Sequence, residues 1–430
     1  MVEMTCDLAP DQQSKSSPPP STIIQQQFEN SENFFEGAEK LLEIWFFGKE
    51  KNSSLRKIPK SELDRLMDIA GCKILQVLRT EQIDSYLLSE SSLFVSDRRL
   101  ILKTCGQTRP LLVISELLKL AQIYGRMDIV TNVYYSRKNF FCPQLHATFD
   151  EEISLLDGFF EGAVYYSRKN FFCPQLHATF DEEISLLDGF FEGGTAYCMG
   201  PLNQDRWYLY TLTSSPPKAI IAAHQPKLPD HTLELQMTGI PAEVLRIYSW
   251  AECPSGAAEC TKRSGILDLL PRETLIQDEL FKPVGYSMNG VIDHDEYVTI
   301  HITPEPEFCY VSFETNHRRG CLFEQARKVL NIYKPARFIL TLFASKLSVE
   351  ARASQQRFWK EELEGYKRAS VQMLRLQQDK VLFALFVRDK AQEENDSSYF
   401  YDQENVQLTE NNTQVKTKGG NDDGRCNEPR

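Results

Sequence analysis

The segment LLSESSLFVSDRRLILKTCG (87–106) places three serines and one acid between two apolar stretches. The serines are Ser89, Ser91 and Ser92, and the acid is Glu90. A serine hydroxyl can attack the carbonyl carbon of the preceding peptide bond, and the resulting ester can eliminate across the serine Cα–Cβ bond. Cleavage of this kind between Glu90 and Ser91 would leave a chain that begins with a pyruvoyl ketone. Such a ketone forms Schiff bases with amines and accepts electrons, as pyridoxal phosphate does.

A plainer interpretation of the same segment is an edge hairpin whose serines face water. A tight polar turn at residues 97–98 would pair two strands so that Ser91 lies opposite Thr104 and Glu90 opposite Cys105. Directly opposed residues on neighbouring strands have Cβ atoms roughly 5 Å apart. The register therefore predicts Cys105 as a close neighbour of Ser91. Taken alone, the segment still favours the plain hairpin.

A second candidate segment, YVTIHITPE (297–305), alternates polar and apolar residues as a strand does. His301 and Glu305 would share one face, about 13 Å apart at a rise of ~3.3 Å per residue. That separation suits two groups that bracket a ligand the size of a nucleoside. A surface strand with its polar residues in water explains the same pattern.

Three acids near the start, Glu36, Glu39 and Glu43, fall at helical spacing on one face. Such a face is normally solvated. Like charges gathered on it would also suit a dication, or a substrate that carries both a sulfonium and an ammonium group.

The composition narrows the class of protein. The chain has 430 residues, of which 42% are hydrophobic, so it can hold one large domain or two to three smaller ones. Its formal net charge of -12 argues against a nucleic-acid binder and allows cationic small molecules as ligands. No run of about 20 apolar residues is present, so we expect no membrane span and no membrane partner.

The eleven cysteines form no C-x-x-C pair and no zinc-like spacing. We therefore expect reduced thiols in a cytoplasmic (cytosolic) protein and no metal site. The first 30 residues are polar and lack the apolar core of a signal peptide.

The chain divides into a disordered extension (1–30), one folded domain (31–391) and a disordered polar tail (392–430). Strands alternate with amphipathic helices in the folded part, which predicts a mixed α and β fold.

A repeat interrupts that domain. The sequence VYYSRKNFFCPQLHATFDEEISLLDGFFEG (133–162) recurs letter for letter at 164–193, a period of 31. We treat it as a duplicated unit, 133–163 and 164–194. Each copy predicts a strand, a loop and a helix that opens with a capping box, Thr148 with Glu151 in the first copy. We expect one whole copy to pack and the other to be extruded, so a chain without residues 164–194 should fold at least as well as the full chain.

Several segments, taken together and in order, resemble the family of eukaryotic S-adenosylmethionine decarboxylase proenzymes, which depend on a pyruvoyl group. The resemblance covers roughly residues 33–390 and is interrupted only by the extra repeat unit. The segments that carry it are NFFEGAEKLLEIWF (33–46), LSESSLFVS (88–96), LKTCG (102–106), YYSRKNFF, AYCMG (196–200), WYLYTL (207–212), GYSMNG (285–290) and TIHITPEPEFCYVSFETN (299–316).

The resemblance implies a role for each matching catalytic residue. Glu90–Ser91 matches the self-cleavage bond, which would give a 90-residue β chain and a 340-residue α chain whose Ser91 becomes the pyruvoyl cofactor. Ser287 matches a residue thought to stabilise the oxyanion of the acyl shift, and His301 matches the base that drives ester elimination. Cys105 matches the proton donor that acts after CO₂ leaves.

The same resemblance implies a substrate site for S-adenosylmethionine. Glu36 and Glu305 match acids that hold the substrate, with Glu305 on the ribose hydroxyls, and Glu39 matches a further active-site acid. Phe35 and Phe281 match two rings that sandwich the adenine and favour the sulfonium cation.

The resemblance also implies stimulation by putrescine, which the mammalian-type enzyme binds in an acidic pocket beside the active site. The matching residues are Glu43, Asp230, Thr232, Glu234 and Glu314. An aromatic partner would come from VYYSR, which occurs twice, so both Tyr134 and Tyr165 are candidates.

The implied fold is of the α+β class, a four-layer α/β/β/α sandwich with two antiparallel sheets. The implied function is self-processing, pyruvoyl-dependent decarboxylation of S-adenosylmethionine for spermidine and spermine biosynthesis, by a homodimer of processed αβ units. The alternative is a non-catalytic protein, either a regulatory isoform or one misfolded by the duplicated segment. A regulatory isoform would usually have lost the processing serine, and Ser91 is present.

Overall fold

The computed structural model describes residues 36–140, 179–213, 230–305, 308–377 and 379–389. The predicted disordered segments, 1–30 and 392–430, lie outside these residues.

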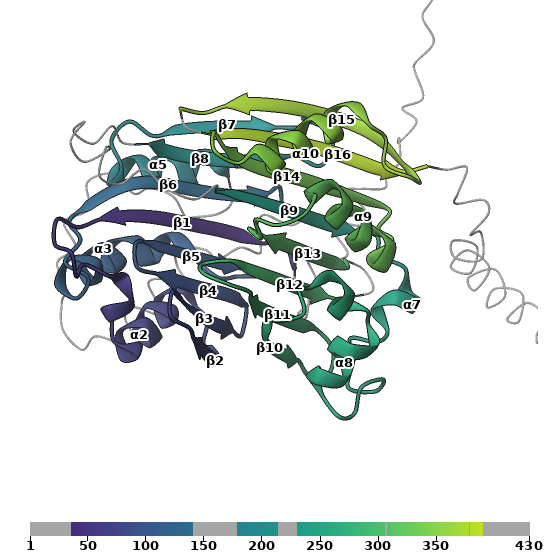
Figure 1. Cartoon of the computed structure of the whole chain (residues 1–430), viewed down its shortest axis with the longest axis horizontal. Coiled ribbons are helices and arrows are strands. Elements are labelled where there is room, and N and C mark those ends of the chain that lie inside the picture. The colour runs from purple at the N-terminus through teal and green to yellow at the C-terminus, as the bar shows by residue number, and fades with distance from the viewer. Residues whose placement is uncertain (1–35, 141–178, 214–229, 306–307, 378, 390–430) are drawn as a thin grey trace, which may run out of the picture.

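Two eight-stranded sheets form the centre of the molecule, and every strand pair in both of them is antiparallel (Figure 1). The first sheet has the order β2-β3-β4-β5-β1-β6-β8-β7 and the second has β10-β11-β12-β13-β9-β14-β16-β15. The second order repeats the first with each number raised by eight, so the two halves of the chain share one topology.

The strands of the first sheet are β1 (Lys40–Phe47), β2 (Ile74–Arg79), β3 (Ile83–Leu88), β4 (Ser91–Ser96), β5 (Arg99–Thr104), β6 (Ile129–Lys138), β7 (Thr195–Met199) and β8 (Trp207–Thr213). Those of the second are β9 (His231–Thr238), β10 (Leu275–Leu280), β11 (Tyr286–Val291), β12 (Tyr297–Thr303), β13 (Tyr310–Thr315), β14 (Arg337–Ser345), β15 (Tyr366–Arg375) and β16 (Asp379–Arg388).

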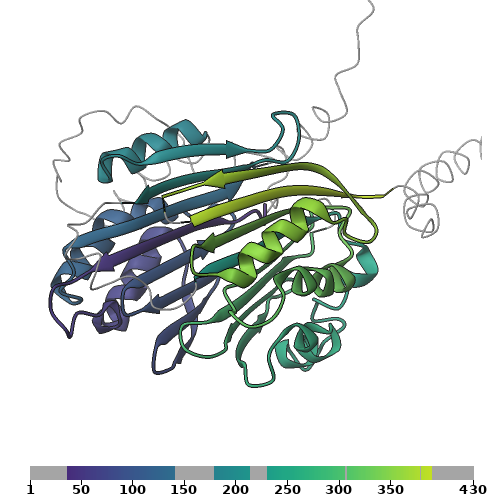
Figure 2. The same cartoon turned by 45° about the horizontal axis from the view of Figure 1, so that its top comes forward.

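Helices cover the outer faces of both sheets, which confirms the predicted four-layer α/β/β/α sandwich (Figure 2). The α-helices are α2 (Lys60–Ala70), α3 (Ile114–Ile123) and α5 (Phe180–Phe190) on the first sheet, and α7 (Ala242–Leu245), α8 (Ala257–Arg263), α9 (Leu322–Tyr333) and α10 (Val349–Lys360) on the second. Short 3₁₀ helices are η1 (Leu55–Lys57), η2 (Pro110–Val113) and η4 (Ile266–Leu269). Within the described ranges, no helix has the length and apolar character needed to cross a membrane.

Local sequence explains how these layers meet. In α2, Leu63, Met67 and Ala70 lie three or four residues apart and are buried, and Gly71 ends the helix with a φ of 82°. In β4, successive side chains point to opposite faces of the sheet. Leu93 joins the core under the helices, whereas Phe94 points to the second sheet, where it stacks on Tyr297 with ring centroids 4.4 Å apart.

The layer between the two sheets is apolar at its ends and polar in its middle. Phe94 and Tyr297 belong to one apolar end, and Trp207 packs edge-on against Phe343 at the other. The buried polar side chains between them include Glu39, Glu43, Ser92, Arg99, Lys103, Glu234, Ser287, Asn289, Thr299, His301 and Glu314. Because buried charges and amides are costly unless they are paired, this layer is where a binding or catalytic site is expected.

In the described part of the duplicated segment, a strand comes from the first copy and a helix comes from the second. The strand β6 contains 133–138 of the first copy, whereas α5 belongs to the second. Thr179 and Glu182 form the capping box predicted for such a helix, while the matching residues of the first copy lie outside the described range. Described residues of both copies therefore belong to the packed fold, so the expectation that one copy packs and the other is extruded is corrected.

The residues that flank the two copies explain this choice. β6 starts at Ile129, four residues before the repeat, and Ile129 continues the pairing with β1 opposite Phe47. The second copy is preceded by FEGA, which is a poorer strand sequence.

Gly194, which follows the second copy directly, explains why the helix of that copy can precede β7. A β-carbon at Gly194 would overlap the hydroxyl and ring of the buried Tyr210, whose hydroxyl donates to Asp188 Oδ1 at 2.9 Å. After the first copy the corresponding residue is Ala163. The second helix therefore leads into β7 through a glycine, at a position where alanine would clash with Tyr210.

Two deletions of 31 residues test this contact, because they differ in one residue. Removal of 163–193 joins Gly162 to Gly194, and this chain should be about 1 kcal/mol more stable than the full chain because its loop is shorter. Removal of 164–194 leaves Ala163 against Tyr210, which should lower the free energy of unfolding by about 1–3 kcal/mol relative to the first deletion. Urea unfolding of both proteins measures the difference. Equal stability of the two shortened chains would contradict the role given to Gly194. The expected difference would mean that the chain without 164–194 is less stable than the sequence alone led us to expect.

Candidate active site

The Glu90–Ser91 bond lies at a tight turn, and not inside a strand as its sequence suggested. Leu88 pairs with Ser91, so Ser89 and Glu90 form a two-residue connection between β3 and β4. The hydroxyl of Ser89 accepts from the backbone N–H of Lys73 at 2.9 Å, which ties the turn to the chain before β2. Ser91 itself has a φ of 116°, a value that side chains other than glycine rarely adopt. The bond is thus held at a strained backbone position.

Both sides of this bond have specific partners. The carbonyl oxygen of Glu90 accepts from the backbone N–H of Cys105 at 3.3 Å. The hydroxyl of Ser91 donates to Glu39 Oε1 at 2.8 Å, and both side chains are almost fully buried. Ser91 pairs with Thr104, as the predicted register required. A polarised carbonyl and an oriented hydroxyl therefore meet at the predicted cleavage bond.

Burial sets the ionisation of the groups beside Ser91. The pKa of Cys105 is raised because the thiol is desolvated and because Glu39 and Glu90 lie near it. Cys105 is therefore a protonated thiol at neutral pH, a form that can donate a proton. Desolvation also raises the pKa of Glu39, against the opposing effect of Lys103.

His301 of β12 reaches the same place from the second sheet. Its Nδ1 lies 2.9 Å from Ser287 Oγ, and its Nε2 lies 2.7 Å from Thr299 Oγ1 and 3.0 Å from Ser92 Oγ. Desolvation, and then the positive charge of Lys103, lower the pKa of His301 to about 3. The imidazole is therefore neutral over the physiological range, and a neutral imidazole can accept a proton.

The three acids near the start of the chain do not lie on a helix. Glu43 belongs to β1, and Glu36 and Glu39 precede that strand in irregular backbone. All three are buried, so the alternative of a solvated helix face is also wrong. The spacing matched a helix, but β1 lies in the middle of the first sheet, where pairing with β5 and β6 determines its conformation.

Two buried cations neutralise part of this acidic layer. Lys103 Nζ lies 2.7 Å from Glu314, 2.8 Å from Glu234 and 3.2 Å from Glu39. The side chain of Lys103 is 1% exposed, so these attractions are poorly screened by solvent. Its pKa is well above the usual value, since the three carboxylates outweigh the desolvation of the ammonium group.

Arg99, which lies four residues before Lys103 on β5, is the second buried cation. It lies 3.1 Å from Glu43 and 3.6 Å from Asp230. Desolvation nevertheless raises the pKa of Glu43 to about 7, although Arg99 and a hydrogen bond from Trp45 oppose the rise. Glu43 thus carries a proton about half of the time at neutral pH.

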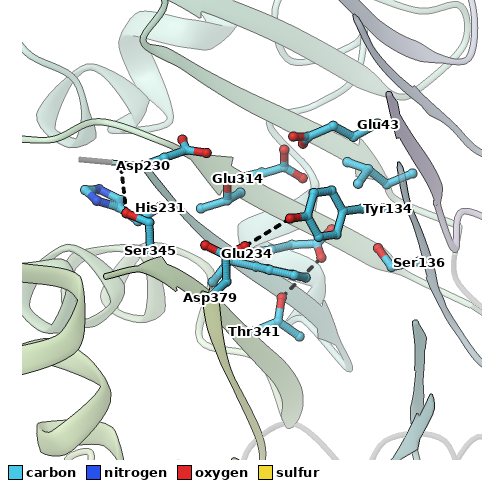
Figure 3. A pocket seen from close by; sticks show the side chains of 13 residues that line it. Glu43, Tyr134, Ser136, Asp230, His231, Glu234, Glu314, Thr341, Ser345 and Asp379 are labelled. Carbon is cyan, nitrogen blue, oxygen red and sulfur yellow. Dashed lines mark hydrogen bonds between the residues drawn. The ribbon is translucent and has the colours of Figure 1, made fainter. Parts of the chain in front are cut away.

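A cavity of about 50 Å³ opens beside these ion pairs (Figure 3). It holds about four water-sized groups. Its lining includes Glu43, Asp230, Thr232, Glu234 and Glu314, the five residues predicted for one pocket. Of the two candidate tyrosines, Tyr134 of the first copy lines the cavity, together with Phe343, while Tyr165 lies outside the described residues. The five predicted residues are therefore brought together.

Comparison with known proteins identifies the family. A family model described as adenosylmethionine decarboxylase matches residues 32–165 and 161–387. The chain belongs to the adenosylmethionine decarboxylase family. The two matches overlap at residues 161–165, within the duplicated segment, and together they span nearly all of the predicted domain.

Individual relatives of this adenosylmethionine decarboxylase agree. The S-adenosylmethionine decarboxylase proenzyme of Caenorhabditis elegans is 45% identical over 376 residues, which cover 86% of this chain and 92% of that protein. The proenzyme of Onchocerca volvulus is 43% identical over 84% of this chain and 90% of that protein. The crystal structure of a Trypanosoma brucei AdoMetDC-delta26 monomer is 21% identical, covers 56% of this chain and 89% of that chain, and has a TM-score of 0.37. The family predicted from the motifs is confirmed, and nothing in these comparisons favours a non-catalytic isoform.

Three residues predicted to hold the substrate of this decarboxylase lie outside the strands, and one of them lies outside the described structure. Phe35 falls just outside it. Phe281 follows β10, and its backbone N–H donates to the Gly285 carbonyl at 2.8 Å. β12 ends at Thr303, so Glu305 lies two residues beyond the strand on which its spacing placed it.

Several polar residues of the site were absent from the sequence-based prediction. Lys103 and Arg99 provide the buried cations, and Ser92 contacts both His301 and Asn289. The alternation Arg99-x-x-x-Lys103 places both on one face of β5, but a charged strand residue is more often solvated. Only the second sheet, packed on that face, makes them part of the site.

Proposed function

We propose that the chain cuts itself between Glu90 and Ser91, and that Ser91 becomes the pyruvoyl group with which it decarboxylates S-adenosylmethionine. Decarboxylation of S-adenosylmethionine is the reaction of this family, and its product supplies aminopropyl groups for spermidine and spermine biosynthesis. The single observation that carries the proposal is the pair of contacts at the bond, from Cys105 N–H to the Glu90 carbonyl and from Ser91 to Glu39.

In the first step, Ser91 Oγ attacks the Glu90 carbonyl carbon, and the C–N bond breaks to leave an ester and a free amine. The Cys105 N–H, and the Ser287 hydroxyl according to the family's motif, stabilise the negative charge that develops on the carbonyl oxygen. Removal of the Ser91 Cα proton then expels the Glu90 carboxylate, with His301 as the base. Addition of water and loss of ammonia leave the ketone on the new amino terminus.

The residues around Ser91 fit such a group. The position is buried, the carboxyl group of Glu39 lies beside it, and a protonated thiol is its neighbour. A pyruvoyl group supplies a carbonyl that takes up the substrate amine and draws in the electrons left when CO₂ departs. Cys105 then returns the proton to the carbon that lost CO₂.

The remaining side chains bind and orient the substrate. Glu36 and Glu305 are assigned to substrate contacts, and Glu39 provides negative charge near the cationic amine and sulfonium groups. Phe35 and Phe281 are assigned to the two faces of the adenine. Burial between two sheets excludes water, so these electrostatic contacts act in a medium of low dielectric constant.

An intact mass spectrum of the purified, denatured chain tests the proposal. We expect two pieces that meet at Glu90–Ser91, the larger with a pyruvoyl mass at its amino terminus. A single uncut chain of full mass would overturn it for this molecule, whatever its family.

We further propose that putrescine stimulates the enzyme from the cavity in Figure 3. Five acids line that cavity. Among the described residues, four of them form ion pairs with two cations, Arg99 and Lys103, and Lys103 also neutralises Glu39. The excess of buried negative charge favours protons or a cationic ligand, and a linear diamine supplies two charges in a narrow volume.

The raised pKa of Glu43 predicts how this stimulation depends on pH. A dication favours the ionised carboxylate, so binding below a pKa of about 7 must release a proton from Glu43. Affinity should therefore rise with pH, and the half-saturating putrescine concentration should be about 5–10-fold lower at pH 8 than at pH 6. The raised pKa of Glu234 acts in the same direction. Decarboxylation rates at a series of putrescine concentrations give this value, and Glu43→Gln should flatten the dependence. A half-saturating concentration that is constant across this range would contradict the prediction.

A homodimer of processed αβ units in the cytosol completes the proposal. The outermost strands of the described sheets are β2 and β7 in the first and β10 and β15 in the second, and the edge of a sheet can pair with a second copy. Light scattering after size-exclusion chromatography gives the mass in solution, and a monomer would overturn this part alone.

A further inference from the structure

One acid of the cavity was not among the predicted residues. Asp379 is the first residue of β16 and pairs with Ser345 of β14. On the other side of Ser345 lies Asp230, whose backbone N–H donates to Ser345 Oγ at 3.1 Å. Asp230 and Asp379 therefore flank one serine at the outer end of the cavity (Figure 3). The side chain of Asp230 is 32% exposed, compared with 2% for Glu314 at the inner end.

Asp379 differs from the other acids of the cavity in its partner. Arg99 or Lys103 forms an ion pair with each of the other four. Asp379 Oδ2 instead accepts a hydrogen bond from the Tyr134 hydroxyl at 3.0 Å. Among the residues that the structure describes, no basic side chain lies within ion-pair distance of Asp379.

This arrangement leaves Asp379 with capacity for a cation. Burial raises the pKa of Asp379 and the charge of Asp230 adds to the rise, whereas the bond from Tyr134 and the more distant charge of Lys346 oppose it. A carboxylate accepts about four hydrogen bonds, so the single Tyr134 bond leaves most of this capacity to a ligand. An ammonium group at Asp379 would remove the cost of the unpaired charge.

We propose that Asp379, oriented by Tyr134, binds one ammonium group of an aliphatic diamine whose other ammonium group lies among the inner acids. The inference rests on the proposed stimulation by putrescine and assigns the residue that makes the cavity select a diamine over a monoamine. A monoamine with the same carbon chain satisfies only one end of the cavity, and its methyl end would lie against an unpaired carboxylate.

The test compares putrescine with butylamine on the processed enzyme. For each protein, the half-saturating concentration of each amine is measured against that protein's own unstimulated rate, and binding is measured by calorimetry. Asp379→Asn should raise the putrescine value about tenfold or more and change the butylamine value less than about twofold. Tyr134→Phe keeps the charge of Asp379 but removes its orienting bond, so the loss of putrescine selectivity should be smaller. Asp389→Asn is the matched control, because Asp389 follows the other end of β16 and pairs with Lys367 at the surface.

The outcomes separate this inference from the function on which it rests. Unchanged selectivity in Asp379→Asn, with putrescine still active on the unaltered enzyme, would overturn the role of Asp379 alone. Failure of putrescine to bind or stimulate the unaltered enzyme would overturn both proposals. If Asp379→Asn does not fold, the selectivity for putrescine over butylamine is measured in Asp379→Glu and Tyr134→Phe instead. Retained selectivity in the first and reduced selectivity in the second support the proposal, and equal selectivity in both overturns it.

Discussion

Ser91→Ala should leave the chain uncut and abolish decarboxylation. Alanine has no hydroxyl to attack the Glu90 carbonyl, and no route from alanine leads to a ketone at this position. The loss should be about 10⁴-fold or more, since the group that accepts the substrate amine is never made. Intact mass gives the extent of cleavage, and release of CO₂ from carboxyl-labelled substrate gives the rate. The fold should survive, because the change removes one buried hydroxyl and its bond to Glu39.

Ser96→Ala is the matched control for this change. Ser96 ends the same strand, and its hydroxyl donates only to the Arg99 carbonyl, at 3.4 Å. We expect full cleavage and normal activity from it. Cleavage of Ser91→Ala at the same bond would show that another nucleophile acts there, and the pyruvoyl assignment to Ser91 would be lost.

Lys103→Met should destabilise the protein by about 3–5 kcal/mol, the usual cost of leaving a buried ion pair with one partner. Three carboxylates, those of Glu39, Glu234 and Glu314, lose the cation that lies within 3.2 Å of each. Methionine preserves most of the volume of the side chain, so the loss comes from electrostatics and not from a cavity. Urea unfolding measures the change in free energy.

The pH dependence of this variant gives a second readout. Without Lys103, the raised pKa values of Glu39 and Glu234 rise further in the folded state, so the folded protein holds more protons than the unfolded chain. Stability should therefore fall as pH increases above about 4.5, and the defect should be smaller at pH 5.5 than at pH 8. The control is Lys119→Met at a 63% exposed position paired with Glu116, which should cost less than about 1 kcal/mol. An equally small cost for Lys103→Met would contradict the prediction that Lys103 is needed to neutralise the buried carboxylates.

Features that depend on neighbouring residues were predictable from sequence. A turn at residues 97–98 and a period of two were enough to place Ser91 opposite Thr104. The capping box of the repeat appears in α5, because its donors and acceptors lie within one helical turn. The family motifs likewise predicted the acids of the cavity, including Asp230 and Glu314.

Other features depended on contacts between distant segments. Glu39 and Glu43 have the spacing of a helix, but neighbouring strands hold Glu43 in β1 and the second sheet buries both. Lys103 and Asp379 join the site only because two sheets meet face to face.

The duplicated segment shows most clearly the difference between features set by neighbouring residues and features set by contacts between distant segments. Its copies are identical, so no local property can say which strand or which helix packs. By itself, the sequence predicted the strand, the helix and the family, and it suggested the cleavage bond that we propose. The tertiary structure decided between the copies, because β1 extends the pairing of the first strand through Ile129 and Tyr210 leaves no room for a β-carbon at Gly194. It likewise decided which charges are buried together, since burial and ion pairing arise only between elements far apart in the chain.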